Sequence, residues 1–260
     1  MPLRRPRPLR LRNPEAVFSV RVHNLPMDRR SFVEHCAVSA SCLAASAATP
    51  GFAADTRARS YPRAVLTDEQ GHPLRVGSLK AQTNYVFHYP FEATPVFLLD
   101  LGHAAQPQRL STKGNESYAW PGGVGKTSSV VAFSAICAHQ LVYPTQQVSF
   151  ISFRKSRAAK GVQDNLIHCC ADHSQYDPAQ GAKVMMGPAE QPLCAVLLDY
   201  DAKDDTLTAH GTLGGELFEA FFKKYAFKLS LDVGPSAKRQ VAQRTTVREL
   251  EKFCRNPVQC

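Results

Sequence analysis

Long apolar segments are scarce in this 260-residue sequence. Near the N-terminus, the mildly apolar run Cys36 to Ala48 falls short of the about 20 residues that a membrane-spanning helix needs. The sequence therefore offers no convincing membrane anchor. Apolar residues at helical spacing are also scarce between residues 55 and 136, which argues against a mainly helical domain there.

Residues 27–54 have the layout of a signal for twin-arginine export. Arg29 and Arg30 precede the mildly apolar run, and small residues follow it where a signal peptidase would cleave. Because such signals stand at the start of a chain, we expect translation to begin at Met27 and residues 1–26 to be a mis-assigned upstream segment. Twin-arginine export carries folded proteins and predicts a periplasmic location, with membrane association only if the signal is retained.

Lysine is missing from residues 1–54, which carry eight arginines and three acidic residues. The whole chain has 31 basic and 22 acidic residues, so residues 55–260 retain 23 and 19, a net charge of +4 instead of +9. Because the excess lies mostly in the segment that we expect to be removed, the charge does not indicate a nucleic-acid partner.

The rest of the chain reads as short strands separated by turns that contain glycine and proline. This spacing predicts an antiparallel all-β fold. The expected strands are residues 64–66, 74–79, 84–90, 95–102, 128–136, 183–186, 193–198 and 206–209.

Two short helices are expected after these strands. Residues 216–224 place apolar side chains at helical spacing, with acidic residues early and lysines late, as the helix dipole favours. Thr246 and Glu249 have the spacing of a capping box and predict a short final helix. We expect the tail 234–260 to bind a partner or a membrane surface, or to be a solvated extension.

Residues 122–127 look like a phosphate-binding loop, but the pattern requires glycine where this chain has Trp120. A strand instead of a helix follows them, so we expect no nucleotide partner.

Two short Cys/His pairs each follow an apolar run. The first is Cys137-Ala-His139, and the second is Cys170-Ala-Asp-His173. Two thiolates and two imidazoles can hold an iron–sulfur cluster of mixed ligation, although a tetrahedral zinc site can use the same residues. Cys169 competes with Cys170 for the metal, but the spacing to His173 favours Cys170.

The surroundings of the second pair resemble a known family. Ser174-Gln-Tyr176-Asp-Pro follows His173, and Gly187-Pro188-Ala189 follows a short strand. Together with the two Cys/His pairs, these residues resemble a Rieske protein, in which two such loops hold a [2Fe–2S] cluster and a Gly-Pro loop covers it.

The resemblance implies a Rieske-type antiparallel β-sandwich over residues 55–233, with an inserted cluster-binding subdomain at about 135–192 and short C-terminal helices. It implies that two cysteines bind one iron and two histidines bind the other. Hydroxyl groups that donate to cluster sulfurs raise the reduction potential, and two side chains are candidates for this role. The implied ligands are Cys137, His139, Cys170 and His173, and the candidate hydroxyl donors are Ser174 and Tyr176.

The chain departs from the family pattern in three ways. Thirty residues (140–169) separate the two pairs, which suggests a basic hairpin around 154–161. Val142 and Asp172 stand where respiratory members carry a disulfide that joins the ligand loops, and the usual glycine after the second histidine is missing. Among the cysteines left over, Cys254 and Cys260 are spaced to close a small loop. Cys169 and Cys194 are also spare.

The expected function is electron transfer by an exported small subunit that resembles the Rieske subunit of arsenite oxidase. Such a subunit moves single electrons and performs no substrate chemistry of its own. The implied partners are a larger catalytic oxidoreductase subunit, a c-type cytochrome, or both. The alternative is the Rieske subunit of a quinol–cytochrome c oxidoreductase, against which the weak apolar run and the missing disulfide count.

Overall fold

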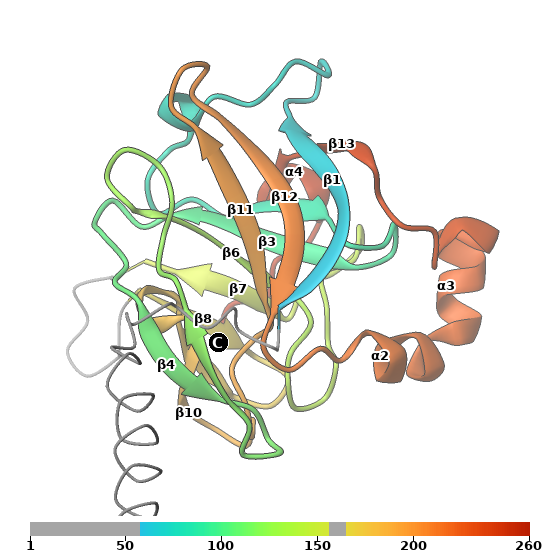
Figure 1. Cartoon of the computed structure of the whole chain (residues 1–260). Coiled ribbons are helices and arrows are strands. Elements are labelled where there is room, and N and C mark those ends of the chain that lie inside the picture. The colour runs from blue at the N-terminus through green and yellow to red at the C-terminus, as the bar shows by residue number, and fades with distance from the viewer. Residues whose placement is uncertain (1–57, 156–164) are drawn as a thin grey trace, which may run out of the picture. The chain divides into compact units, whose positions relative to one another are not determined.

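The computed structural model describes residues 58–155 and 165–260 (Figure 1). The expected upstream segment 1–26, the signal segment 27–54 and most of the expected basic hairpin at 154–161 lie outside these residues. Strands dominate the described part, and its helices are short, so the prediction of an all-β fold is confirmed. In the same part, no helix combines the length and apolar character that a membrane crossing requires.

The larger sheet has eight strands in the order β13-β1-β12-β11-β6-β3-β2-β14. Neighbouring strands are antiparallel, except that β1 and β13 run parallel. The strands are β1 (Arg59–Thr67), β2 (Tyr85–His88), β3 (Pro95–Asp100), β6 (Val130–Ser134), β11 (Ala195–Asp201), β12 (Thr206–Leu213), β13 (Gln243–Thr246) and β14 (Arg248–Glu249).

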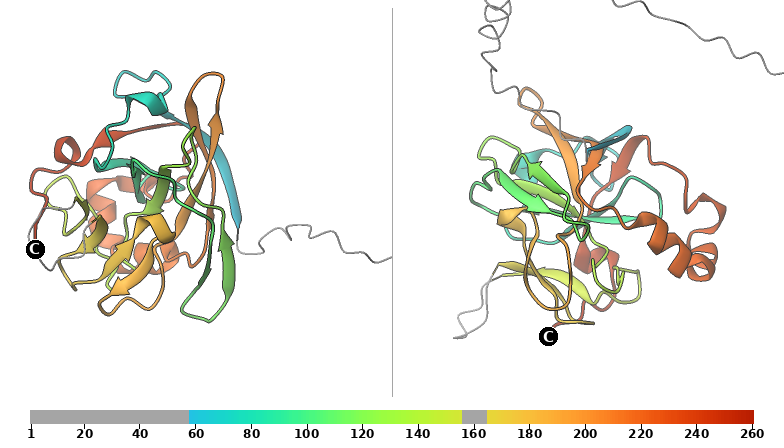
Figure 2. Two further views of the ribbon diagram at one scale, coloured as in Figure 1. Left: turned by 90° about the vertical axis from the view of Figure 1, so that its left-hand side faces the viewer. Right: turned by 60° about the horizontal axis from the view of Figure 1, so that its bottom comes forward.

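The chain between β6 and β11 forms a second, four-stranded sheet in the order β10-β9-β8-β7 (Figures 1 and 2). The chain leaves the larger sheet after β6 and returns to it at β11, and these two strands are neighbours because Phe133 of β6 pairs with Ala195 of β11. The strands are β7 (Ile151–Arg154), β8 (Leu166–Cys169), β9 (Gln175–Asp177) and β10 (Lys183–Met186). A separate hairpin joins β4 (Gln108–Ser111) to β5 (Ser117–Trp120).

The central strands of the larger sheet are buried on both faces. Along β3, Phe97 and Leu99 belong to one apolar cluster, and Val96 and Leu98 belong to another, as the two-residue period of a strand requires. The first cluster extends to Ile151 and to residues of β8 and β9, so the small sheet shares an apolar core with the larger one.

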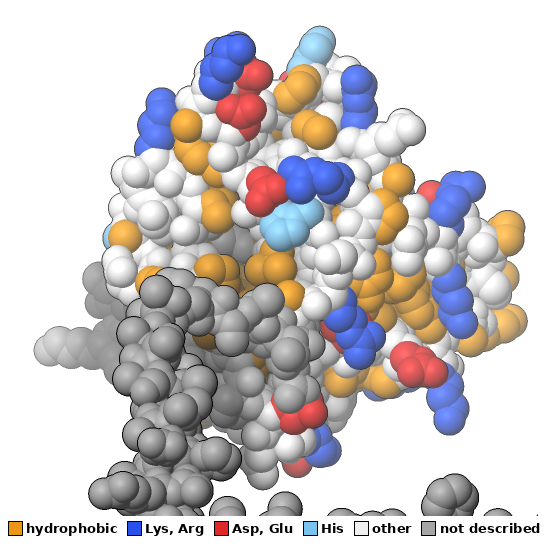
Figure 3. All heavy atoms as spheres, viewed as in Figure 1, with side chains coloured by type: hydrophobic (Ala, Val, Ile, Leu, Met, Phe, Trp, Pro, Cys, Tyr) orange, Lys and Arg blue, Asp and Glu red, His pale blue; other side chains and the backbone are white. Residues whose placement is uncertain are grey.

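The helices follow β12 and form part of an extension with exposed apolar side chains. The predicted helix at 216–224 is confirmed as α2 (Phe218–Lys224), which α3 (Ala226–Asp232) follows. Phe227 and Leu231 of α3 are 80% and 70% exposed, and Figure 3 shows hydrophobic side chains gathered on this side of the molecule.

Two expectations for secondary structure are wrong. Residues 74–79 form a single turn of 3-10 helix, η1 (Val76–Ser78), instead of a strand. Thr246 is no helix cap, because it belongs to β13 and pairs with Thr67 of β1. The final helix α4 (Leu250–Phe253) begins after Glu249 without a side-chain cap. Two further 3-10 turns are η2 (Pro178–Gln180) and η3 (Gly234–Ser236).

Candidate metal centre

The first loop of the site begins at the end of β6 and closes on itself. The Leu141 N–H donates to the Cys137 carbonyl at 2.9 Å, and the Cys137 N–H donates to the Val142 carbonyl at 2.8 Å. Leu141 has φ of 59°, in the left-handed region. This turn buries the Cys137 thiol completely and leaves the His139 side chain 34% exposed.

The second loop repeats this hydrogen-bond pattern, with Cys169 in the place of Cys137. The His173 N–H donates to the Cys169 carbonyl at 2.7 Å, and the Cys169 N–H donates to the Ser174 carbonyl at 2.9 Å. His173 has φ of 61°, as Leu141 does at the matching position of the first loop. The two loops therefore present Cys137 and Cys169 as equivalent residues.

Three side-chain donors converge between the loops, and a fourth, from His139, contacts one of them. The sulfurs of Cys137 and Cys169 and a carboxylate oxygen of Asp172 lie within 4.8 Å of one another. Asp172 Oδ2 is 3.1 Å from Cys137 Sγ and 3.1 Å from His139 Nδ1. Two sulfur donors and one oxygen donor thus lie together with a nitrogen donor beside the oxygen, a combination found in mixed-ligand metal sites.

The structure brings together only two of the four residues predicted as ligands, Cys137 and His139. Cys170 forms a disulfide with Cys260, which removes its thiolate as a ligand while the disulfide is intact. The His173 ring is exposed, and this residue contributes its backbone to the turn. The difference arises because adjacent residues at the end of a strand point to opposite sides, so burying Cys169 turns Cys170 away.

The sequence did contain signals for this register. Leu166, Ile167 and His168 lead directly into Cys169 as the buried strand β8, and Asp172 follows Cys169 with two residues between them. If Cys169 is aligned with the second cysteine of the family pattern, no residue is missing where that pattern has glycine. His173 occupies its place, with the positive φ that glycine adopts most easily.

The predicted pairing of Cys254 with Cys260 is wrong, because Cys254 is free and buried. The tail instead runs beside β7, where the Val258 N–H donates to the Ser149 carbonyl at 2.8 Å. Arg154 donates to the Val258 carbonyl at 3.1 Å, which directs Cys260 towards Cys170.

Burial and hydrogen bonding set the protonation of the thiols. A hydrogen bond from Cys169 lowers the pKa of Cys137 in spite of its burial, and the Tyr176 hydroxyl adds to this effect. The same bond to Cys137, followed by burial, raises the pKa of Cys169. Cys137 therefore deprotonates to the thiolate more easily than Cys169 does.

The Tyr176 hydroxyl holds the first loop through contacts with Cys137 and Ala138. Its oxygen accepts from the Ala138 N–H at 3.1 Å and lies 3.2 Å from Cys137 Sγ, within hydrogen-bond distance of the sulfur. Burial, and then the charge of Cys137, raises the pKa of Tyr176 and keeps it protonated. Of the two candidate hydroxyl donors, Tyr176 reaches a site sulfur, whereas Ser174 Oγ accepts from the Ala189 N–H at 3.2 Å.

The loop 187–189 covers the second ligand loop. Gly187 has φ of +92°, and a Cβ at this position would lie 2.5 Å from Ser174 Cα and 2.7 Å from the His173 carbonyl oxygen. The absence of a side chain therefore lets the backbone of the covering loop touch the backbone of the ligand loop.

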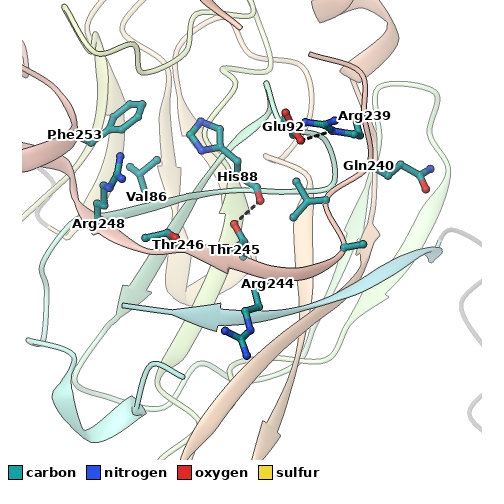
Figure 4. A pocket seen from close by; sticks show the side chains of 12 residues that line it. Val86, His88, Glu92, Arg239, Gln240, Arg244, Thr245, Thr246, Arg248 and Phe253 are labelled. Atoms are coloured by element: carbon teal, nitrogen blue, oxygen red, sulfur yellow. Dashed lines mark hydrogen bonds and ion pairs between the residues drawn. The ribbon is translucent and has the colours of Figure 1, made fainter. Parts of the chain in front are cut away.

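A separate cavity of about 550 Å³ lies at β2 and β13 (Figure 4). Glu92 pairs with Arg239 at its rim, and Thr245 donates to the His88 carbonyl at 2.9 Å. Burial, followed by the charge of Arg248, lowers the pKa of His88 to about 4. Its lining includes no residue of the two ligand loops.

No protein-family model matches the sequence. Among solved structures, the chain is similar to the soluble domain of the Rieske protein II (soxF) from Sulfolobus acidocaldarius. The two are 28% identical, the match covers 60% of this chain and 82% of that chain, and the TM-score is 0.40.

Proposed function

We propose that the chain binds a [2Fe–2S] cluster between loops 137–142 and 169–174 and transfers single electrons through it. The observation that carries this proposal is the repeated loop geometry, which buries one cysteine from each loop against the other. The donor set fits the group, because two thiolates suit one iron and a harder ligand such as imidazole suits the other.

Each side chain has a distinct part in this proposal. Cys137 and Cys169 would hold one iron, the inner one, and His139 would bind the other, outer iron through Nδ1, which lies 3.1 Å from Asp172 Oδ2. When bound, the cluster supplies a reversible one-electron step. The partly exposed His139 ring provides the route by which a partner protein exchanges that electron, and Tyr176 donates a hydrogen bond towards the inner sulfur.

We further propose that the chain is the exported, periplasmic small subunit of an oxidoreductase complex that resembles arsenite oxidase. Its partners are a larger catalytic subunit, a c-type cytochrome, or both. The twin-arginine layout of residues 27–54 supports this proposal. So does the disulfide of Cys170, which runs to the tail and does not join the two ligand loops. The alternative is the Rieske subunit of a quinol–cytochrome c oxidoreductase, for which a retained signal and membrane fractionation are expected.

The cluster is tested by metal analysis and spectroscopy of protein purified without oxygen. Iron and acid-labile sulfide in equal amounts, with the EPR signal of a reduced [2Fe–2S] cluster after dithionite reduction, are expected. Cys169→Ala is expected to lose the cluster, whereas Cys170→Ala is expected to keep it. A colourless protein with one zinc ion would refute the proposal, since donors 3.1 Å apart also suit a single tetrahedral ion.

A further inference from the structure

The carboxylate of Asp172 is buried at the point where the ligand loops meet. Its side chain is 2% exposed, whereas that of its neighbour His139 is 34% exposed. A buried carboxylate is costly unless a cation or hydrogen bonds compensate its charge. Hydrogen bonds from the Ser174 N–H and the Cys137 thiol compensate part of the charge of Asp172, and a metal cation at this point would compensate it further.

The two oxygens of Asp172 have different surroundings. Oδ1 accepts from the Ser174 N–H at 2.9 Å, which fixes the carboxylate within the turn. Oδ2 lies 3.1 Å from both Cys137 Sγ and His139 Nδ1. One oxygen therefore orients the group, and the other points into the donor cluster.

Asp172 and His173 are adjacent in the sequence but have different parts in the loop. His173 holds the left-handed position of the turn, and its N–H donates to the Cys169 carbonyl. In the described part of the chain, no hydrogen bond or ion pair joins its ring to Cys137, Cys169 or His139. Asp172 stands three residues after Cys169, the offset of histidine in the Cys-x-x-His pattern.

We propose that Asp172 Oδ2 is the fourth ligand of the metal centre and binds the outer iron beside His139 Nδ1. The inference rests on the proposed cluster. A carboxylate carries one negative charge where a neutral imidazole carries none, so the bound cluster is more negative than one with two imidazole ligands. More negative charge makes reduction harder, and the reduction potential is lower than in a two-histidine site.

The number of histidine nitrogens bound to iron tests this assignment directly. The probe is the reduced, iron-loaded chain labelled with ¹⁵N-histidine, measured by pulsed EPR. We expect one strongly coupled histidine nitrogen, and we expect His139→Ala to abolish it. Asp172→His is expected to add a second coupled nitrogen and to raise the reduction potential, while the matched control His173→Ala changes neither.

Two coupled nitrogens in the unsubstituted protein, one of them lost in His173→Ala, would overturn the Asp172 assignment and leave the [2Fe–2S] proposal standing. A chain that binds zinc and no iron would overturn both. Because the decisive count is made on the unsubstituted protein, a variant that fails to fold does not obscure the result.

Discussion

Substituting Gly187 with alanine tests the contact between the covering loop and the second ligand loop. The new Cβ would lie 2.5 Å from Ser174 Cα, 2.7 Å from the His173 carbonyl oxygen and 2.8 Å from the Ser174 nitrogen. All three atoms belong to the backbone, so no flexible side chain can move aside. Ordinary contacts begin at 3.4 Å, and one of the two loops must therefore shift by almost an ångström.

Two effects contribute to the loss of stability in Gly187→Ala. Alanine at a positive φ costs about 1–2 kcal/mol, and forcing atoms into a packed site costs about 1–3 kcal/mol more. Gly71 provides the matched control, because it has φ of +84° but nothing within 4 Å of its added Cβ. Gly71→Ala should therefore cost only the backbone term, about 1–2 kcal/mol, and Gly187→Ala about 2–5 kcal/mol.

Urea denaturation of the two variants and the parent measures the difference, and iron content reports on the ligand loop. We expect Gly187→Ala to be the more destabilised variant and to bind less iron, while Gly71→Ala binds iron as the parent does. Equal losses of unfolding free energy, with full iron content in both variants, would show that the covering loop does not press on the ligand loop.

Three further predictions concern stability and the environment of the site. His88 has a folded pKa of about 4 against about 6.5 when unfolded, so the unfolded chain binds the proton first as the pH falls. Between pH 6.5 and 4, the free energy of unfolding should decrease by about 1–3 kcal/mol, and His88→Gln should remove this decrease while His72→Gln should not. Cys260→Ser and Cys170→Ser should each lower the free energy of unfolding by about 2–4 kcal/mol, and the double variant should lower it no further, because each change removes the same disulfide. All three variants should still bind iron. Loss of iron from Cys170→Ser alone would show that Cys170 is a ligand. Tyr176→Phe should lower the reduction potential in a redox titration and cost about 1–3 kcal/mol in denaturation, because the Ala138 N–H loses its acceptor; an unchanged potential would exclude a hydrogen bond to the inner sulfur.

The sequence predicted the all-β fold and the first loop, because both depend on local patterns. Strand periodicity and turn residues are read within a few positions, and Cys137 and His139 directly follow a buried strand. The family resemblance implied that the loop at Gly187 covers the cluster, and in the structure this loop contacts Ser174 of the second ligand loop.

The second loop could not be settled from spacing alone. Two adjacent cysteines allow two registers, and a histidine at the expected offset from Cys170 favours the one that the structure does not show. The choice depends on which side of β8 faces the core, and on Cys260, whose pairing joins residues 90 positions apart. Pairing over such a distance leaves no local signal.

The position of β1 inside the larger sheet constrains the order in which the protein can fold. Its residues pair with Thr206–Leu213 on one side and with Gln243–Thr246 on the other, so the first described strand is completed only after the ribosome has made residue 246. Both loops proposed to bind the metal, 137–142 and 169–174, are synthesised well before that point. Such distant pairing places folding in the range of milliseconds to seconds, and the thiols of a newly made chain stay accessible during this time. Metal supplied while the chain is being translated should therefore compete better with oxidation of these thiols than metal supplied afterwards.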